Sequence, residues 1–527
     1  MKKLTALLLL AIIFSASFLA AEISVVPYGA AQTVSGSCFL LDADGEKILI
    51  DHGLFMDNDG ENKEINDMPE ELIETKALFL THAHLDHSGR IPLLVNKGFK
   101  GTIYSTAATK ELALLLFRER NGFEIIERKW FWSQTQMEKA QNKNVTAVAH
   151  WDKGCKENIK NIEYSSAFVN LGDLCEIYNV KFLACKNCSA KETVEIEKLF
   201  KVINYDEENV FSEKLKFKFI RAGHIPGSAS IVFTVNLASA AAAMSGSDAA
   251  IRKKIIFSGD LGSGYSRLNG EFSIPEKADF IFMESTYADD KAKFDFTAYD
   301  AFQDDLAKAV AGGKTVWIPA LSFNRTQKVL YELRLMQKNG KLPKNFPVHS
   351  VSPSANKITE LYQKELADNK KGYWFTEDIY KEGSIIPEKA SIKRDIKFDK
   401  PLIVVSSSGD LERGASARIA PSLLPRKDVE IMIVNYVSPK SAAGMLLAGR
   451  GKVKGIKSNA GIKKYDIFSD HPDFGMLQKW LSNQSNDAAI YIIHSEKRNA
   501  AKMESLLKKK GRTNVSKTAY KEKIVLQ

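Results

Sequence analysis

Residues Ala77–His87 read Ala-Leu-Phe-Leu-Thr-His-Ala-His-Leu-Asp-His, a short apolar run followed at once by closely spaced polar side chains. The apolar run is typical of a buried strand. Three imidazoles and a carboxylate packed this closely fit neither a helix face nor an ordinary core. On a tight turn they can converge on metal ions, and this donor set suits zinc best, with manganese or iron less well. The stretch therefore predicts a metal centre built from His82, His84, Asp86 and His87.

Three later strand ends offer further ligands of the same chemical kind. His224 lies in a Gly-His-Ile-Pro-Gly-Ser turn after an apolar run, and Asp260 follows the expected strand at 254–258. His494 closes a late apolar run. Loops at strand ends commonly carry chemistry on a β-rich scaffold, and a carboxylate at Asp260 could bridge two ions. The pattern therefore favours two metal ions over one.

Five further motifs sharpen this interpretation. They are Glu284–Tyr287, Pro319–Gln327, Ser352-Pro353, Phe468–Asp473 and His494–Glu496. The order His-x-His-x-Asp-His, Gly-His, Gly-Asp resembles the metallo-β-lactamase superfamily, and the five motifs resemble its β-CASP branch. That branch includes the nuclease subunit of the cleavage and polyadenylation machinery and the bacterial ribonuclease J. The resemblance implies an α/β fold, in which a metallo-β-lactamase αββα sandwich carries an inserted α/β β-CASP domain.

The resemblance also implies a role for each polar residue of the site. One zinc would be held by His82, His84 and His224, the other by Asp86, His87 and His494, with Asp260 bridging them. Asp51 would orient the site, Glu284 would hold His471, and His471 would contact the scissile phosphate and protonate the leaving oxygen. The expected catalytic residues are Asp86, Glu284 and His471.

The expected substrate cleft departs from the family pattern. His52 stands after Asp51 where a small or sulfur-containing residue is usual, and Asp470 and Pro472 flank His471 in place of small residues. Neither departure changes a metal ligand. Candidate contacts to phosphate or to the RNA backbone are Arg325, Ser407, Ser408 and Gly409, for which helix-face and turn roles are the alternative.

The length and the net charge of the chain limit how many domains it has and which class of partner it binds. The chain has 527 residues and a formal charge of +10. This length favours two or three compact units, and the positive charge leans towards a polyanion such as nucleic acid. The expected domains are a signal peptide at 1–21, a first metallo-β-lactamase part at 22–289 with an insertion near 120–200, a β-CASP domain at 290–425, and a second metallo-β-lactamase part, with the RNA-specificity segment, at 426–527.

The first residues have the layout of a secretory signal peptide. A short positive start at Met1–Lys3 precedes an apolar run, and Ala20-Ala21 supplies small residues for cleavage. An uncleaved membrane anchor is the alternative, although the run is short for a span. We therefore expect export, with no membrane association after cleavage.

Cysteine usage suggests structural roles. Cys38 lies in an apolar run and is expected to be a buried small hydrophobe. Cys155, Cys175, Cys185 and Cys188 crowd into the insertion. Given export, two disulfides are favoured, with three pairings open, and a four-cysteine zinc site is the alternative.

The sequence therefore predicts an exported, zinc-dependent phosphodiesterase that cleaves RNA, with two zinc ions and manganese as the alternative metal. The chain ends at Gln527, soon after His494, which favours an endonuclease over the longer ribonuclease J architecture. The expected partner is RNA or another polyanionic nucleic acid, and a homodimer is one candidate assembly. The alternatives are a hydrolase of DNA or small phosphodiesters, and a nucleic-acid-binding protein with a vestigial site.

Overall fold

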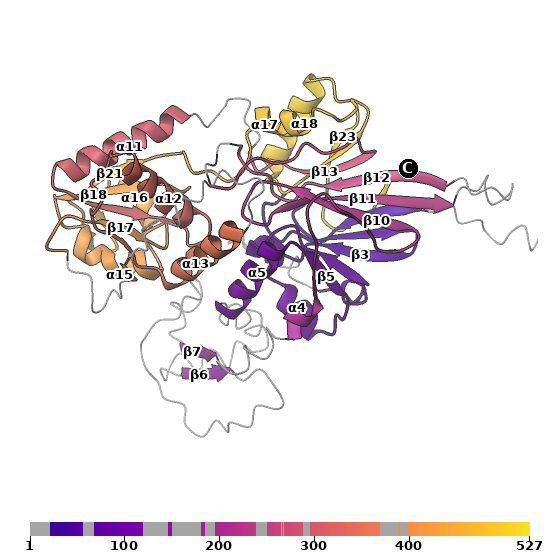
Figure 1. Ribbon diagram of the computed structural model, residues 1–527, viewed down its shortest axis with the longest axis horizontal. Helices are drawn as coiled ribbons and strands as arrows, with labels where there is room; N and C mark the ends of the chain where they lie inside the picture. Colours follow the sequence, from indigo (N-terminus) through magenta and orange to yellow (C-terminus); the bar gives the residue numbers. More distant parts are fainter. Residues whose placement is uncertain are drawn as a thin grey trace, which may run out of the picture.

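The computed structural model describes two β-sheets that pack face to face and a third sheet in a separate α/β body (Figure 1). The described residues are 22–55, 68–119, 146–149, 181–184, 195–238, 250–264, 266, 268–287, 296–368, 388–389 and 398–526. The expected signal peptide at 1–21 and all four cysteines of the insertion lie outside them. Among the described residues, no helix has the length and apolar character needed to cross a bilayer.

The first sheet begins with an antiparallel meander and continues with parallel strands. Its spatial order is β24 (Ile524–Leu526), β1 (Ile23–Pro27), β2 (Phe39–Ala43), β3 (Glu46–Ile50), β4 (Ala77–Phe79), β5 (Thr102–Ser105) and β8 (Phe200–Val202). β4 is buried along its whole length, as its apolar sequence predicts. It lies between β3 and β5, parallel to both, so its last residue delivers the chain to one edge of the sheet.

The second sheet mixes antiparallel and parallel pairs. Its order is β23 (Val515–Lys517), β22 (Ala489–Ile493), β13 (Phe280–Glu284), β12 (Ala250–Phe257), β11 (Ala229–Ala238), β10 (Leu215–Arg221) and β9 (Glu208–Val210). β12, β13 and β22 are parallel neighbours. Their carboxyl ends therefore meet at one edge of the sheet, although they are far apart in the sequence.

An apolar core fills the space between these two sheets. It includes Phe39 and Phe79 from the first sheet and Phe219, Phe233 and Phe257 from the second. The ring centroids of Phe79 and Phe233 lie 5.0 Å apart in an edge-to-face arrangement, a favourable geometry for aromatic pairs. Burial of this surface is the main force that holds the sheets together.

Helices cover the outer faces of both sheets. The first sheet carries α2 (Glu70–Ile73), α3 (Leu85–Ser88), α4 (Ile91–Asn96) and α5 (Ala107–Glu119), and the second carries α17 (Phe474–Trp480) and α18 (Lys497–Lys509). Figure 1 shows α4 and α5 on the opposite side of the strands from α17 and α18. The expected αββα sandwich is confirmed.

The third sheet is parallel throughout and has helices on both faces. Its order is β16 (Glu388–Lys389), β15 (Val348–Ser350), β17 (Ile403–Ser406), β14 (Thr315–Pro319), β18 (Val429–Ile433) and β21 (Gly461–Lys464). The helices are α11 (Phe296–Ala311), α12 (Arg325–Lys338), α13 (Pro353–Asp368), α15 (Gly414–Leu423) and α16 (Ala442–Leu447). This α/β body is inserted between β13 and β22, as expected.

The inserted sheet runs past residue 425, where the sequence suggested that the β-CASP domain ends. β18 and β21 both lie beyond that position and pair within the sheet. Parallel strands of one sheet require crossover connections. The chain passes through α15 on its way from β17 to β18, and through α16 on its way from β18 to β21. The sheet is therefore complete only at Lys464.

Two further pairs of short strands lie outside the three large sheets. The pairs are β19 (Lys452–Val453) with β20 (Ile456–Lys457), and β6 (Thr146–Ala149) with β7 (Lys181–Ala184). Ile358 and Tyr362 of α13 join the core cluster that contains Leu112 of α5. The inserted body is thus anchored against the sandwich, beside the edge where β4 ends.

Candidate metal centre

The histidine motif lies on the turn between β4 and α3, and Asp51 holds this turn in place. Asp51 follows β3 and has a positive φ of 58°, a conformation that is uncommon in non-glycine residues. Its carboxylate accepts hydrogen bonds of 2.8 Å from the amide and the hydroxyl of Thr81. One of its oxygens lies 2.7 Å from Nδ1 of His87. Asp51 therefore directs Nε2 of His87 towards the other potential ligands.

His224 is fixed by the turn that follows β10. Ser228 accepts hydrogen bonds from the amides of His224 and Ile225. Gly223 has a φ of 72°, and a Cβ there would lie 2.9 Å from the amide nitrogen of Phe272. Nδ1 of His224 lies 3.0 Å from the carbonyl oxygen of Asp470. Donation from Nδ1 leaves Nε2 free to bind a metal.

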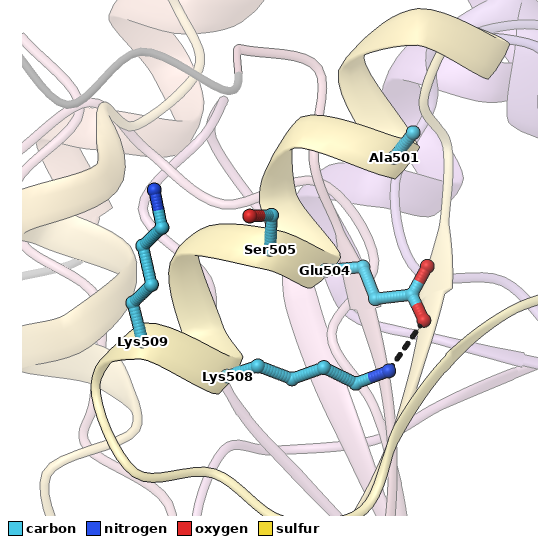
Figure 2. Close-up of a pocket in the computed structure, with 5 residues that line it drawn as sticks. All are labelled: Ala501, Glu504, Ser505, Lys508 and Lys509. Carbon is cyan, nitrogen blue, oxygen red and sulfur yellow. Dashed lines mark hydrogen bonds and ion pairs between the residues drawn. The ribbon is translucent and has the colours of Figure 1, made fainter.

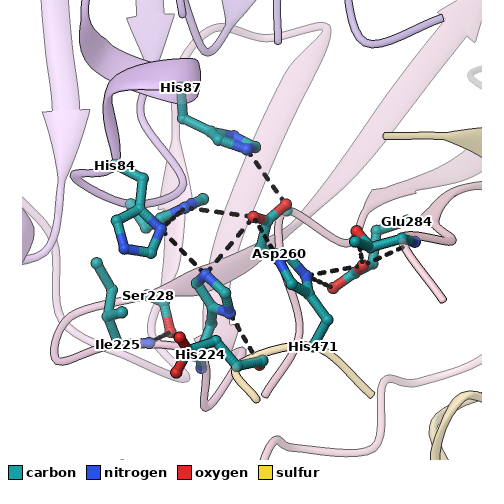
Figure 3. A network of polar contacts seen from close by, with 12 residues as sticks. His84, His87, His224, Ile225, Ser228, Asp260, Glu284 and His471 are labelled. Carbon is teal, nitrogen blue, oxygen red and sulfur yellow. Dashed lines mark hydrogen bonds and ion pairs between the residues drawn. The ribbon is translucent and has the colours of Figure 1, made fainter. Parts of the chain in front are cut away.

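Asp260 stands at the centre of the site (Figure 3). One carboxylate oxygen lies 3.6 Å from Nε2 of both His82 and His224. The other oxygen lies 3.2 Å from Nε2 of His87 and 3.6 Å from Nδ1 of His494. A single carboxylate that faces two sets of imidazoles is the arrangement required of a bridging ligand.

Two groups of potential ligands share this carboxylate. In each group, the ligand atoms lie within 4.8 Å of one another. The first group is His82, His84, His224 and Asp260, and the second is Asp86, His87, Asp260 and His494. The structure therefore brings together all seven expected ligands, divided as the resemblance implied.

The charge states of these groups fit a metal. Burial holds the pKa of His82 well below its usual value and lowers the pKa of His84 to about 3, so both rings are neutral donors. Burial also lowers the pKa of His87, but Asp260 and Asp51 outweigh that effect and raise it. Nε2 of His87 and one oxygen of Asp260 are buried without a hydrogen bond. A divalent cation would satisfy both atoms and displace the proton from His87.

His471 and Glu284 form a pair at the mouth of the site. Nδ1 of His471 lies 3.1 Å from both carboxylate oxygens of Glu284, and its Nε2 lies 4.0 Å from Asp260. Glu284 also accepts hydrogen bonds from the amide of Leu261 and the hydroxyl of Thr286. Burial lowers the pKa of His471, but Glu284 outweighs that effect and raises it to about 10. His471 therefore holds a proton at neutral pH.

The expected phosphate contacts are occupied within the protein. Arg325 donates to the carbonyl of Val434 and lies 3.3 Å from a carboxylate oxygen of Asp470. The Ser407 amide donates to the Ser352 hydroxyl, and the Ser408 hydroxyl donates to Asp410. A Cβ on Gly409 would collide with the amide of Asn435. These residues therefore take part in contacts within the inserted body and with Asp470, which agrees with the alternative interpretation from the sequence.

A buried ion pair beside His471 was not anticipated. Lys328 of α12 is only 3% exposed, and its ammonium group contacts Asp470 and the carbonyl oxygen of Ser469. Together with Arg325 it lowers the pKa of Asp470, against the effect of burial. The sequence marked Asp470 as unusual, but nothing local identified its partner 142 residues away.

Cys38 and a hollow on α18 are two further features that contain reactive or charged side chains. Cys38 is buried, as expected, and its sulfur lies 3.4 Å from Nδ1 of His52. A shallow hollow on α18 is lined by Ala501, Glu504, Ser505, Lys508 and Lys509 (Figure 2). Its Glu504–Lys508 ion pair of 2.7 Å is an ordinary helix pair one turn apart. Neither feature gathers potential ligands as the histidine site does.

Comparisons with known protein families agree with this geometry. Residues 31–131 match the metallo-beta-lactamase superfamily, residues 326–446 match the Beta-Casp domain, and residues 455–517 match the Zn-dependent metallo-hydrolase RNA specificity domain. The fold and the shared carboxylate thus define a metal-dependent hydrolase. The three matches, taken in this order, show that the chain belongs to the β-CASP branch of the metallo-β-lactamase superfamily.

Curated relatives align along most of the chain. Ribonuclease TTHA0252 of Thermus thermophilus is 24% identical, covering 92% of this chain and 96% of the relative. An RNase J-like protein of Methanocaldococcus jannaschii is also 24% identical, covering 89% and 92%. The cleavage and polyadenylation specificity factor 73 of Drosophila melanogaster is 21% identical, covering 94% of this chain and 63% of the relative.

Proposed function

We propose that this protein is a zinc-dependent phosphodiesterase that cleaves RNA internally. The observation that carries the proposal is the position of His471, a protonated imidazole beside a carboxylate shared by two ligand groups. Hydrolysis of a phosphodiester requires an activated water and a proton for the leaving oxygen. The ribonuclease names of two relatives support RNA as the substrate.

The residues of the site would have two roles, holding the metal ions and supplying a proton. His82, His84 and His224 would hold one ion, and Asp86, His87 and His494 the other, with Asp260 between them. When bound, two divalent cations lower the pKa of a water and offset the charge of the phosphate. His471 would donate its proton to the leaving oxygen, and Glu284 would orient its ring.

Three classes of substrate, namely RNA, DNA and a small phosphodiester, test the proposal. Purified protein should cleave labelled single-stranded RNA, and cleavage of a circular RNA should establish internal attack because a circle offers no end. Single-stranded DNA and bis-nitrophenyl phosphate distinguish a nuclease of other specificity from a ribonuclease. Hydrolysis of either without cleavage of RNA under any metal condition would overturn RNA as the substrate. Failure on all three substrates by protein that retains its metal would favour a binding protein.

Zinc is the proposed metal, supported by the imidazole-rich donor set. Protein freed of metal by a chelator should regain RNA cleavage with zinc, and the comparison with manganese tests the choice. Metal analysis of the untreated protein should give two ions per chain. Recovery with manganese alone would overturn the assignment of zinc.

Export is a separate proposal that rests on residues 1–21, whose charged start, apolar run and small residues are typical of a signal peptide. The N-terminal sequence of protein recovered after expression of the full chain in a bacterium decides it. Export predicts a mature protein in the periplasm or medium that begins near Glu22. An intact Met1 on protein confined to the cytoplasm would contradict it.

A further inference from the structure

The loops that follow β14 and β18 bring the inserted body up to the metal centre. The two strands are parallel neighbours, so their carboxyl ends lie at the same edge. The ring of Phe323, in the loop after β14, lies 4.8 Å from the ring of the potential ligand His84. Asn324 in the same loop donates a hydrogen bond of 3.4 Å to the carbonyl of His224. This edge of the inserted sheet therefore forms a wall of the site.

Two large apolar side chains are exposed on that wall. Tyr436, just after β18, is 80% exposed, and Leu321, just after β14, is 52% exposed. Asn435 links them, because its side chain accepts a 3.1 Å hydrogen bond from the Leu321 amide and donates one of 2.9 Å to the Pro319 carbonyl. Their backbones are thus held beside each other by a buried amide.

Leu321 and Tyr436 lie close to the metal centre. Leu321 is two residues from Phe323, so their Cα atoms are at most about 7 Å apart. Phe323 in turn contacts His84. An RNA strand whose phosphate lies at the metal centre around Asp260 would therefore pass its neighbouring nucleotides over Leu321 and Tyr436. Further along the loop the exposed Lys440 offers a positive charge for a phosphate.

We propose that Tyr436, supported by Leu321, forms a stacking platform for a nucleobase of single-stranded RNA next to the cleaved phosphodiester. The proposal rests on the proposed RNA cleavage and adds a base-binding subsite to it. Exposed aromatic rings bind single strands by stacking, which tolerates sequence because every base has a flat face. Continuity with the metal centre identifies the RNA strand as the occupant.

Substitution of Tyr436 tests the platform. Tyr436→Ala should lower kcat/KM for RNA by about 10-fold or more, the usual loss for one stacked base, through a higher KM. Hydrolysis of bis-nitrophenyl phosphate, which lacks a base, should not change. Tyr436→Phe keeps the ring and should behave as the parent. Val210→Ala, at a residue of β9 that is 69% exposed, is the matched surface control.

An abasic scan identifies the base that stacks. In a series of RNA oligonucleotides, each lacks the base at one position near the cleavage site. At one of these positions, removal of the base should lower the activity of the parent protein as much as Tyr436→Ala lowers activity on intact RNA. At that position, Tyr436→Ala should cause no further loss. Equal RNA cleavage by Tyr436→Ala and the parent would overturn the proposal, as would an equal loss on bis-nitrophenyl phosphate.

Two further outcomes separate this proposal from others. If Tyr436→Ala changes the sedimentation of the protein and leaves its RNA affinity unchanged, the platform is a contact between copies of the chain. If the parent cleaves bis-nitrophenyl phosphate but no RNA, the proposed function fails. Fluorescence anisotropy with labelled RNA then still decides the platform, because unchanged RNA binding by Tyr436→Ala would overturn it.

Discussion

The two walls of the site differ in what they contribute. The sandwich supplies all seven members of the two ligand groups around Asp260, each on a loop at the end of a strand or on the helix turn that follows. The wall formed by α12 and the loops after β14 and β18 adds none of these ligands among the described residues. It contributes a buried ion pair, Phe323 against His84, and two exposed apolar side chains. The potential metal ligands and the proposed base-stacking platform therefore lie on two different units of the chain.

This division follows from how each wall is held. The wall that the sandwich supplies, here called the metal wall, consists of short connections at the edges of buried sheets. Strand pairing and the core between the sheets set the backbone positions of these connections. The opposite wall depends on Lys328 and Asp470, which come from distant parts of the chain. Changes on the metal wall should abolish chemistry with every substrate, whereas changes on the opposite wall should affect RNA more than a small ester.

Loss of the shared carboxylate should have the largest effect. Asp260→Ala should reduce hydrolysis of RNA and bis-nitrophenyl phosphate to background, because both ligand groups lose a member. Metal affinity should fall by more than about 100-fold, because loss of a residue that only hydrogen-bonds to a metal ligand already lowers affinity by about 10–100-fold. Metal analysis and activity on both substrates provide the measurement. Glu504→Ala on α18 is the control, and retention of two ions by Asp260→Ala would refute the bridging role.

Removal of the proposed acid should have the next largest effect on activity. His471→Ala should lower kcat for RNA by about 10²–10⁴-fold, while the protein keeps its metal because His471 belongs to neither of the ligand groups that share Asp260. The loss should be smaller for bis-nitrophenyl phosphate, whose nitrophenolate leaves without protonation. An unchanged rate on RNA, or loss of metal from the variant, would show that His471 is not the acid.

Disruption of the buried ion pair should affect stability more than chemistry. Asp470→Asn leaves Lys328 charged and buried, so the free energy of unfolding should fall by about 3–5 kcal/mol. Lys328→Met should cost less, because Arg325 and Asn324 still contact Asp470. The double variant should recover much of the loss, since replacing both partners removes the uncompensated charge.

Urea unfolding of the two single variants and the double variant measures the coupling between Lys328 and Asp470. Activity on RNA and on bis-nitrophenyl phosphate shows whether the pair affects RNA binding or the chemical step. RNA cleavage should fall more than ester hydrolysis, because the pair connects α12 to the segment that carries His471. Lys463→Ala breaks an exposed ion pair with Asp305 and should cost no more than about 1 kcal/mol. Additive losses in the double variant would show that Lys328 and Asp470 are not coupled.

The sequence predicted the metal wall well and the opposite wall poorly. The motif at 82–87 and the later strand ends could be found because each ligand stands next to a recognisable apolar run. Arg325 was expected to face phosphate, but its guanidinium group is used by Val434 and Asp470. The end of the β-CASP sheet was placed too early, because periodicity does not reveal which sheet a strand joins.

The sequence by itself determined the class of chemistry, because ligand type, spacing and position after apolar runs are local properties that survive without coordinates. It also determined that an α/β unit interrupts the ligand set. Only the tertiary structure decided that Lys328 meets Asp470 and that Leu321 and Tyr436 share an edge. These are contacts between segments far apart in the chain, set by strand order and core packing, for which no local pattern carries a signal.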